Sequence, residues 1–224
     1  MNVPMVRHLI RKDWYFNRWL ITTALILGLA SLILCVSGTP TGFYMGATLL
    51  ITVLIGAGTY LITETVLRER TDQTLPFVMS LPVSYLEYST VKILGNIVIF
   101  LVPFGILTIG TWIAITGSSG IADGLLPMAV LLLFEILSAY TLILAVAVIT
   151  ESMGWTIGTM VVLNLVFQLF LFTVARIPDI AQYREGPIAV WNAPVFLILA
   201  GEISVITLAI VVTFYFQSRK TDFL

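Results

Sequence analysis

Six long apolar segments dominate this sequence and limit what it can fold into. An α-helix rises about 1.5 Å per residue, so about 20 apolar residues cross the hydrocarbon core of a bilayer. Segments of roughly this length occupy residues 20–36, 44–66, 93–115, 125–149, 155–174 and 195–216. A transmembrane barrel would show alternating segments of about 10 residues, and the sequence has none. We predict an all-α integral membrane protein with six spans, forming one transmembrane domain over residues 1–224.

Composition and missing motifs exclude several classes of function. The chain is 59% hydrophobic and 10% charged, and its net charge of −1 leaves no basic patch for nucleic acid. One cysteine, Cys35, excludes an internal disulfide, and one histidine, His8, excludes a multi-histidine metal site. No lysine follows a glycine, so no P-loop for ATP exists. We expect no catalytic residue, no cofactor and no metal in this chain.

The distribution of basic residues predicts the orientation of the six spans. An even number of spans places both termini on one side, and cytoplasmic loops carry an excess of Lys and Arg. The opposite side holds only Arg176 and Arg184. We therefore expect both termini to be cytoplasmic, in the plasma membrane of a bacterial or archaeal cell. The terminal side holds the other basic residues, which are Arg7, Arg11, Lys12, Arg18, Arg68, Arg70, Lys92, Arg219 and Lys220.

The first 19 residues combine an apolar and a basic face. Val6, Ile10 and Trp14 recur at helical spacing, while Arg7 and Arg11 fall on another face. This pattern predicts an amphipathic interfacial helix on the inner leaflet. A simple basic anchor for the first span explains it equally well.

The loop between the second and third spans, residues 68–88, is the longest that faces inward. It begins with charged and polar residues and then exposes apolar ones. Pro76 suits the first turn of a short helix, Pro82 would close it, and Ser84 with Glu87 forms a capping box that starts the next span. We predict a short helix lying across the membrane face. Its apolar side chains indicate a partner, although the loop could instead fold back onto its own bundle.

The residues of this loop resemble those of ABC type-2 permeases. In that family an acidic residue leads into a Gly-Thr-Leu-like turn, a Leu-Pro-Val-Ser step follows, and a Lys opens the third span. The opening string Leu9-Ile10-Arg11-Lys12-Asp13-Trp14 is similar to the interfacial helix of the family. One departure is Asp72-Gln73, where a Gly often precedes the Thr. The matching strings are Glu69-Arg70-Thr71-Asp72-Gln73-Thr74-Leu75, Ser80-Leu81-Pro82-Val83-Ser84, and Lys92.

The resemblance implies the membrane subunit of an exporter. Two six-span subunits, here a homodimer, would surround a substrate path in membrane lipid, and each would dock a separate ABC ATPase subunit. ATP and magnesium would then bind the ATPase, present in two copies. The segment at residues 176–192 resembles the external hairpin of the family, which would cap the path from outside. The residues that would couple to the ATPase are Glu69, Thr74, Leu75, Phe77, Val78, Met79 and Leu81.

Two carboxylates fall inside predicted spans, Glu135 in the fourth and Glu202 in the sixth. An ionised carboxylate there costs about 2.5–3.5 kcal/mol, so each needs a partner, water or a proton. Counting residues from the span ends places Asn164 at the depth of Glu135 and Gln168 at the depth of Glu202. These pairs either hold helices together or line the transport path. They also leave open a second function, an ion- or proton-coupled secondary carrier.

Two further patterns concern helix packing. Glu64 precedes Arg68 by four residues near the inner end of the second span, which predicts a pair on one helix face. Gly42 with Gly46, and Gly154 with Gly158, each have the small-residue spacing that lets helices approach closely. The sequence does not distinguish contact within one bundle from contact between two copies.

Overall fold

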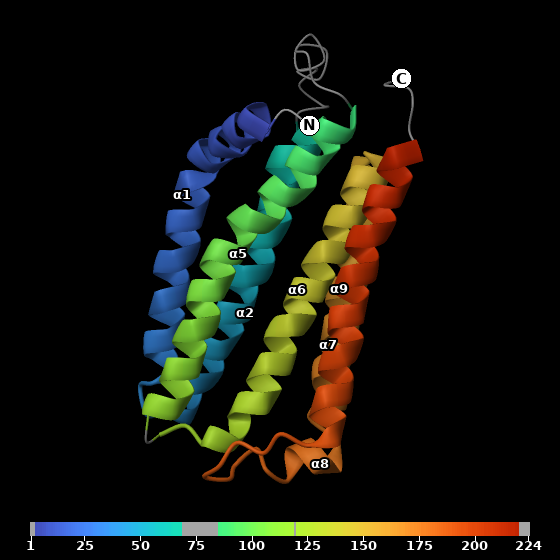
Figure 1. The fold of residues 1–224 in the computed structure, drawn as a ribbon. Coiled ribbons are helices and arrows are strands. Elements are labelled where there is room, and N and C mark those ends of the chain that lie inside the picture. Colours follow the sequence, from blue (N-terminus) through green and yellow to red (C-terminus); the bar gives the residue numbers. More distant parts are fainter. Residues whose placement is uncertain (1–2, 69–84, 119, 220–224) are drawn as a thin grey trace.

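The computed structural model describes residues 3–68, 85–118 and 120–219 (Figure 1). These ranges are mostly helical and contain no strand, which confirms the predicted all-helical fold for this part of the chain. The short elements are a π-helical turn, η1 (Thr63–Leu67), a 3₁₀ turn, η2 (Asp123–Leu125), and helix α8 (Pro178–Ala181). The long helices are α1 (Val3–Cys35), α2 (Pro40–Ile62), α5 (Tyr85–Gly117), α6 (Leu126–Thr150), α7 (Met153–Val174) and α9 (Ala193–Arg219).

Each of the six long helices is long and apolar enough to cross a membrane. Each overlaps most of one of the six apolar segments predicted from the sequence, with α2 continued by η1 to Leu67, so the number and order of the spans are confirmed at this level. Many large apolar side chains point outward, above all on α7 and α9. Such a surface suits lipid, and the structure is that of a membrane-embedded protein.

Helix α1 begins and helix α9 ends at the same end of the bundle, which we name the upper end after its place in Figure 1. Helix α8 lies at the opposite, lower end. Helix α1 continues without interruption from Val3 into the first span, so the first part of this helix holds the residues expected to be interfacial. The predicted coupling segment, residues 69–81, lies outside the described residues.

Local sequence explains where the helices begin and end. The Thr39 side chain accepts a hydrogen bond from the Gly42 amide at 3.1 Å and caps α2, whose first residue is Pro40. The described part of α5 begins at Tyr85, and the predicted cap residue Ser84 lies outside the described residues. Glu151 adopts a left-handed conformation with φ of 53°, which ends α6 and allows α7 to start at Met153.

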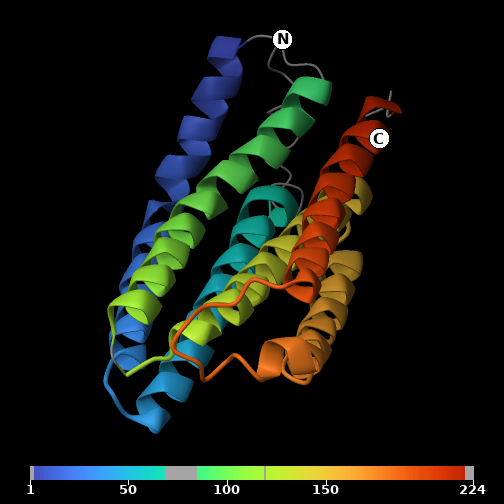
Figure 2. The ribbon, with the colours of Figure 1, turned by 60° about the horizontal axis from the view of Figure 1, so that its bottom comes forward.

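The helices form two groups that meet at α6. Helices α1, α2 and α5 contact one another, and α6 contacts α7 and α9 on its other side (Figures 1 and 2). Helix α6 also contacts α2 and α5, so it joins the two groups. The main apolar core lies along this junction, with Leu54 and Leu61 of α2, Phe100 and Leu107 of α5, and Ile143 of α6 buried in it.

Candidate functional site

A buried ion pair joins α1 to α5 near the upper end. The Lys92 Nζ atom lies 3.6 Å from Oδ2 of Asp13, and the two side chains are only 6% and 8% exposed. Lys12 approaches the other oxygen of Asp13 at 3.7 Å but is 43% exposed. The Asn17 amide donates to the Asp13 carbonyl oxygen one turn further along α1. The sequence did not predict this ion pair.

One turn below Lys92, Asn96 links α5 to η1 through its side chain and to α6 through its main chain. Its amide donates to the Lys92 carbonyl at 2.8 Å, and its carbonyl oxygen accepts from the Thr65 hydroxyl on η1 at 2.8 Å. The Tyr140 hydroxyl on α6 donates to the Asn96 main-chain carbonyl at 2.9 Å. We call Asp13, Thr65, Lys92, Asn96 and Tyr140 the upper network. It connects the ends of α1, α2 and α5 with the middle of the bundle.

The hydrogen bond from Tyr140 is testable by removal of one atom. Tyr140→Phe keeps the ring, which stacks on Phe100 with centroids 4.0 Å apart, and removes only the hydroxyl. We expect a loss of about 1 kcal/mol in the free energy of unfolding, measured by titration of detergent micelles with dodecyl sulfate. Tyr60→Phe, at a side chain that is 50% exposed on α2, is the control and should change nothing. Equal losses in both variants would contradict the buried bond.

The π-helical turn η1 holds the predicted pair of Glu64 and Arg68. The Arg68 Nη1 atom lies 2.7 Å and 2.9 Å from the two carboxylate oxygens of Glu64, so the prediction is confirmed. A π-helical turn widens a helix by one residue and often occurs at functional sites. Here it ends immediately before the predicted coupling segment, and it also contributes Thr65 to the upper network.

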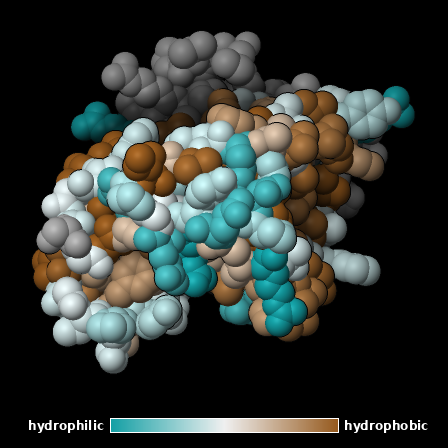
Figure 3. All heavy atoms as spheres, turned by 90° about the horizontal axis from the view of Figure 1, so that it is seen from below, coloured by the Kyte–Doolittle hydropathy of each residue, from teal (hydrophilic) through white to brown (hydrophobic). Residues whose placement is uncertain are grey.

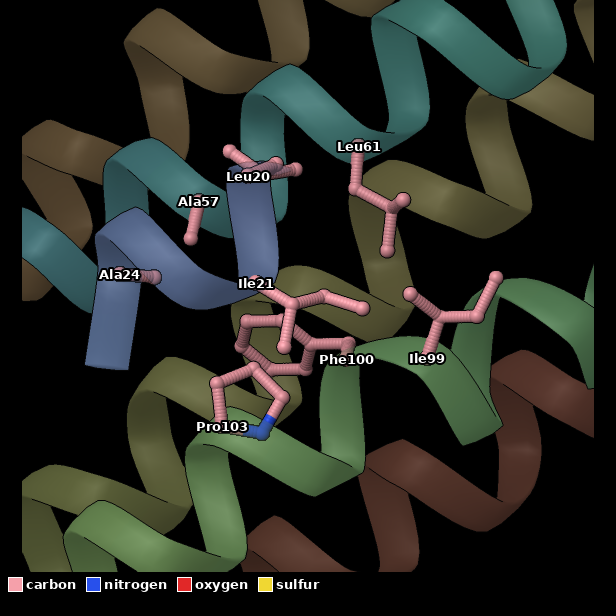
Figure 4. A pocket seen from close by; sticks show the side chains of 8 residues that line it. All are labelled: Leu20, Ile21, Ala24, Ala57, Leu61, Ile99, Phe100 and Pro103. Carbon is pink, nitrogen blue, oxygen red and sulfur yellow. The ribbon is translucent and has the colours of Figure 1, made fainter. Parts of the chain in front are cut away.

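An apolar pocket lies between α1, α2 and α5, with Phe100 and Pro103 on one side and Ala24 and Ala57 on the other (Figure 4). Its free space is about 10 Å³, which is enough for a single water molecule. The pocket has no charged lining residue, and we assign no substrate to it.

The two intramembrane carboxylates lie at the same level of α6 and α9, two helices that contact each other. Glu202 is only 5% exposed, and Glu135 is half-buried. Among the described residues, neither oxygen of the Glu202 carboxyl group has a hydrogen-bond partner. The structure therefore leaves open two acceptors inside the bundle.

The expected pairs with amides on α7 do not form. Glu202 makes no hydrogen bond to Gln168, whose side chain is exposed. Asn164 is exposed as well, and its amide donates at 2.9 Å to the Met160 carbonyl of its own helix rather than to Glu135. Two residues at equal depth do not necessarily touch, because contact also depends on how each helix is rotated about its axis, and the sequence does not determine that rotation. Both amides point away from the carboxylates.

The outer face of α7 is open along a regular stripe. Gly154, Gly158, Val161, Leu165 and Gln168 follow a spacing of four and three residues, and all are exposed. A Cβ atom on Gly158 would meet nothing within 4 Å, and one on Gly154 only a side chain of its own turn. The second glycine pair therefore makes no close contact within the described part of this bundle.

The other glycine pair behaves differently. A Cβ atom on Gly46 would lie 2.5 Å from the Ser31 carbonyl oxygen and 2.7 Å from the Cys35 amide nitrogen. Gly46 thus permits the close approach of α2 to α1 within one bundle. Of the two explanations that the sequence left open, contact within the bundle is confirmed for this residue.

The segment before α9 closes the lower end of the bundle. Ile180 of α8 is buried against Val174, Val195 and Leu131. The Gly124 amide donates to the Gly186 carbonyl at 3.0 Å, which fastens this segment to the start of α6. Hydrophilic side chains gather over the middle of this end, with hydrophobic surface beside them (Figure 3). This position is compatible with the predicted external hairpin at residues 176–192, and its role in capping a transport path from outside stays a prediction.

Comparison with known proteins gives no match, since no family model, curated protein or solved structure matches the chain. The resemblance to ABC type-2 permeases therefore rests on the motif residues alone.

Proposed function

We propose that this chain is the membrane-spanning permease subunit of an ATP-driven ABC exporter, working as half of a dimer with a separate ATPase. The observation that carries the proposal is the string from Glu69 to Leu81, which resembles the coupling segment of ABC type-2 permeases. Six helices of spanning length, with α1 beginning and α9 ending at one end, agree with the six-span plan of that family.

The surroundings of the segment support a coupling role. The π-helical turn η1 precedes it and α5 follows it, both at the upper end. The upper network joins these two elements through Thr65 and Asn96 and reaches α6 through Tyr140. Force applied to the segment by a bound ATPase would thus be transmitted to α6, which also holds Glu135.

The open face of α7 supports a second copy of the chain. If this face of α7 contacted lipid, the side-chain amides of Asn164 and Gln168 would lie in hydrocarbon, where polar groups cost free energy. Against a second copy, Gln168 would form interhelical hydrogen bonds and Gly158 would allow close packing. This arrangement gives the exposed stripe a partner and agrees with a homodimer.

Co-purification tests the proposal. The tagged chain, solubilised in mild detergent from its native cells, should bring down an ABC ATPase, and the complex should have the mass of two copies of each subunit. Phe77→Asp should abolish this association, because a charged group would replace an apolar one in the ATPase groove. Mass photometry and ATPase activity of the eluate measure both outcomes.

Gln73→Asp is the matched control, since it adds the same charge to the polar part of the same segment. It should retain the ATPase. Release of the ATPase by both variants would point to general disruption of the segment by charge. Purification of the wild-type chain without an ATPase would refute the exporter.

The common level of Glu135 and Glu202 on neighbouring helices favours one other candidate, the ion- or proton-coupled secondary carrier. Its distinguishing result is flux by the purified chain alone in proteoliposomes, driven by a proton or sodium gradient. The exporter instead requires ATP and the second subunit.

A further inference from the structure

Three buried side-chain atoms lack a hydrogen-bond partner in the described part of the chain, namely Thr108 Oγ1 and the two carboxyl oxygens of Glu202. Elsewhere, the buried Asn96, Tyr140 and Gln217 side chains are all bonded. A buried polar group without a hydrogen bond costs about 1–3 kcal/mol of stability. Unbonded acceptors therefore mark a place where a ligand that donates hydrogen bonds would bind favourably.

The unpaired groups lie at one level of the bundle. Glu135 and Glu202 each stand nine residues after the first residue of their helices, and Thr108 stands nine before the last residue of α5. At about 1.5 Å per residue, each is roughly 13–14 Å from the lower end. Helices α5, α6 and α9 contact one another. The three residues therefore occupy one layer of the bundle.

Two cross-helix contacts give the same level independently. The Gln217 side chain of α9 donates a hydrogen bond to the Val148 carbonyl of α6, so residues 69 positions apart lie at one level. Because the two helices run in the same direction, this offset places Glu202 at the level of Leu133. The Tyr140 ring of α6 stacks on the Phe100 ring of α5, so these two residues lie at one level. Because the two helices run in opposite directions, Thr108 of α5 then lies at the level of Leu132 of α6. Both positions are within one turn of Glu135.

The charges around this layer have one sign. Residues 126–174 contain no lysine or arginine, and the basic residues of the other two helices, Lys92 of α5 and Arg219 of α9, lie near the upper end. The adjoining side chains Leu131, Leu133 and Ile136 are buried and apolar. A positive charge at this site must therefore come from a ligand, and the rest of that ligand must be apolar.

We propose that Glu202 and Glu135 bind the ammonium group of a lipophilic cation, and that the cargo of this permease is a cationic amphiphile. Glu202 accepts hydrogen bonds from the ammonium group, and Thr108 adds a third oxygen to the layer. The half-buried Glu135 marks the side from which the ligand enters. The identification of the bound cation as cargo rests on the proposed transport function, whereas the binding site itself does not depend on that function.

The test uses dansylcadaverine, an amine with a fluorescent apolar group, and the purified full-length chain in nanodiscs without ATPase or nucleotide. Fluorescence titration should show saturable binding. Glu202→Gln should weaken binding about tenfold or more, because a hydrogen-bonded charge is lost, and Glu135→Gln should weaken it less. The N-acetyl derivative, which has no positive charge, should bind the wild type no better than the amine binds Glu202→Gln.

Glu185→Gln is the matched control, because it removes a carboxylate that is 87% exposed at the lower end, and it should bind like the wild type. Thermal unfolding of Glu202→Gln should occur at the wild-type temperature or higher, since the variant removes a buried charge and breaks no hydrogen bond of the described residues. Any one of four results would overturn the proposal. They are unchanged binding by Glu202→Gln, equal binding of the neutral derivative, absence of binding by the wild type, and displacement of the amine by sodium at constant ionic strength. None of these results affects co-purification of the ATPase, so the two proposals fail separately.

Discussion

Lys92→Met is expected to lower the free energy of unfolding by about 3 kcal/mol. The substitution keeps most of the apolar stem of the side chain but removes the buried ammonium group that faces the carboxylate of Asp13, and breaking a buried ion pair usually costs about 3–5 kcal/mol. We expect the low end of that range because Lys12 still approaches the other oxygen of Asp13. Unfolding of the purified chain in mixed micelles, followed by far-ultraviolet circular dichroism, measures the loss.

The same carboxylate supplies the control. Lys12→Met removes the second lysine of Asp13, but this one is 43% exposed, and exposed pairs contribute about 0–1 kcal/mol. Combining Lys92→Met with Asp13→Asn should recover part of the stability, because the buried side chain that faced Lys92 is then no longer charged. Equal losses from the two lysine variants, or a double variant as unstable as the sum of the single ones, would contradict a buried ion pair.

The six helices could be predicted from the sequence because their signal is local. Length and apolarity fix the number of spans and their approximate bounds. The pair of Glu64 and Arg68 was predictable for the same reason, since both residues lie on one face of one helix. The neighbours of each helix were not predictable, because the spans are apolar all round and their sequence leaves the buried face undefined.

The candidate site was predicted only in part, for a related reason. Counting residues gave the depth of Glu135 and Glu202, and the structure keeps both near the middle of their helices. The direction in which each side chain points depends on helix rotation, so the partners assigned on α7 were wrong. The upper network was missed, although Lys92 and Asn96, four residues apart on an apolar helix, were a usable signal.

Gly46→Ala is expected to destabilise the bundle by about 3 kcal/mol. The added methyl group would meet the Ser31 carbonyl oxygen and the Cys35 amide on α1, and these are main-chain atoms that no side-chain rotation can move. Helices α1 and α2 would have to separate where they pack most closely, and overpacking of this kind costs about 1–3 kcal/mol. The thermal midpoint of the purified chain in detergent should fall accordingly.

Gly56→Ala is the control on the same helix, ten residues further along, where an added Cβ atom meets nothing within 4 Å. It should leave stability unchanged or raise it by up to about 1 kcal/mol, because alanine favours a helix more than glycine does. The contrast separates helix propensity from helix contact, since both variants change propensity by the same amount. A Gly46→Ala chain as stable as Gly56→Ala would mean that α1 and α2 do not approach through this residue, and the packing of the first two spans would have to be revised.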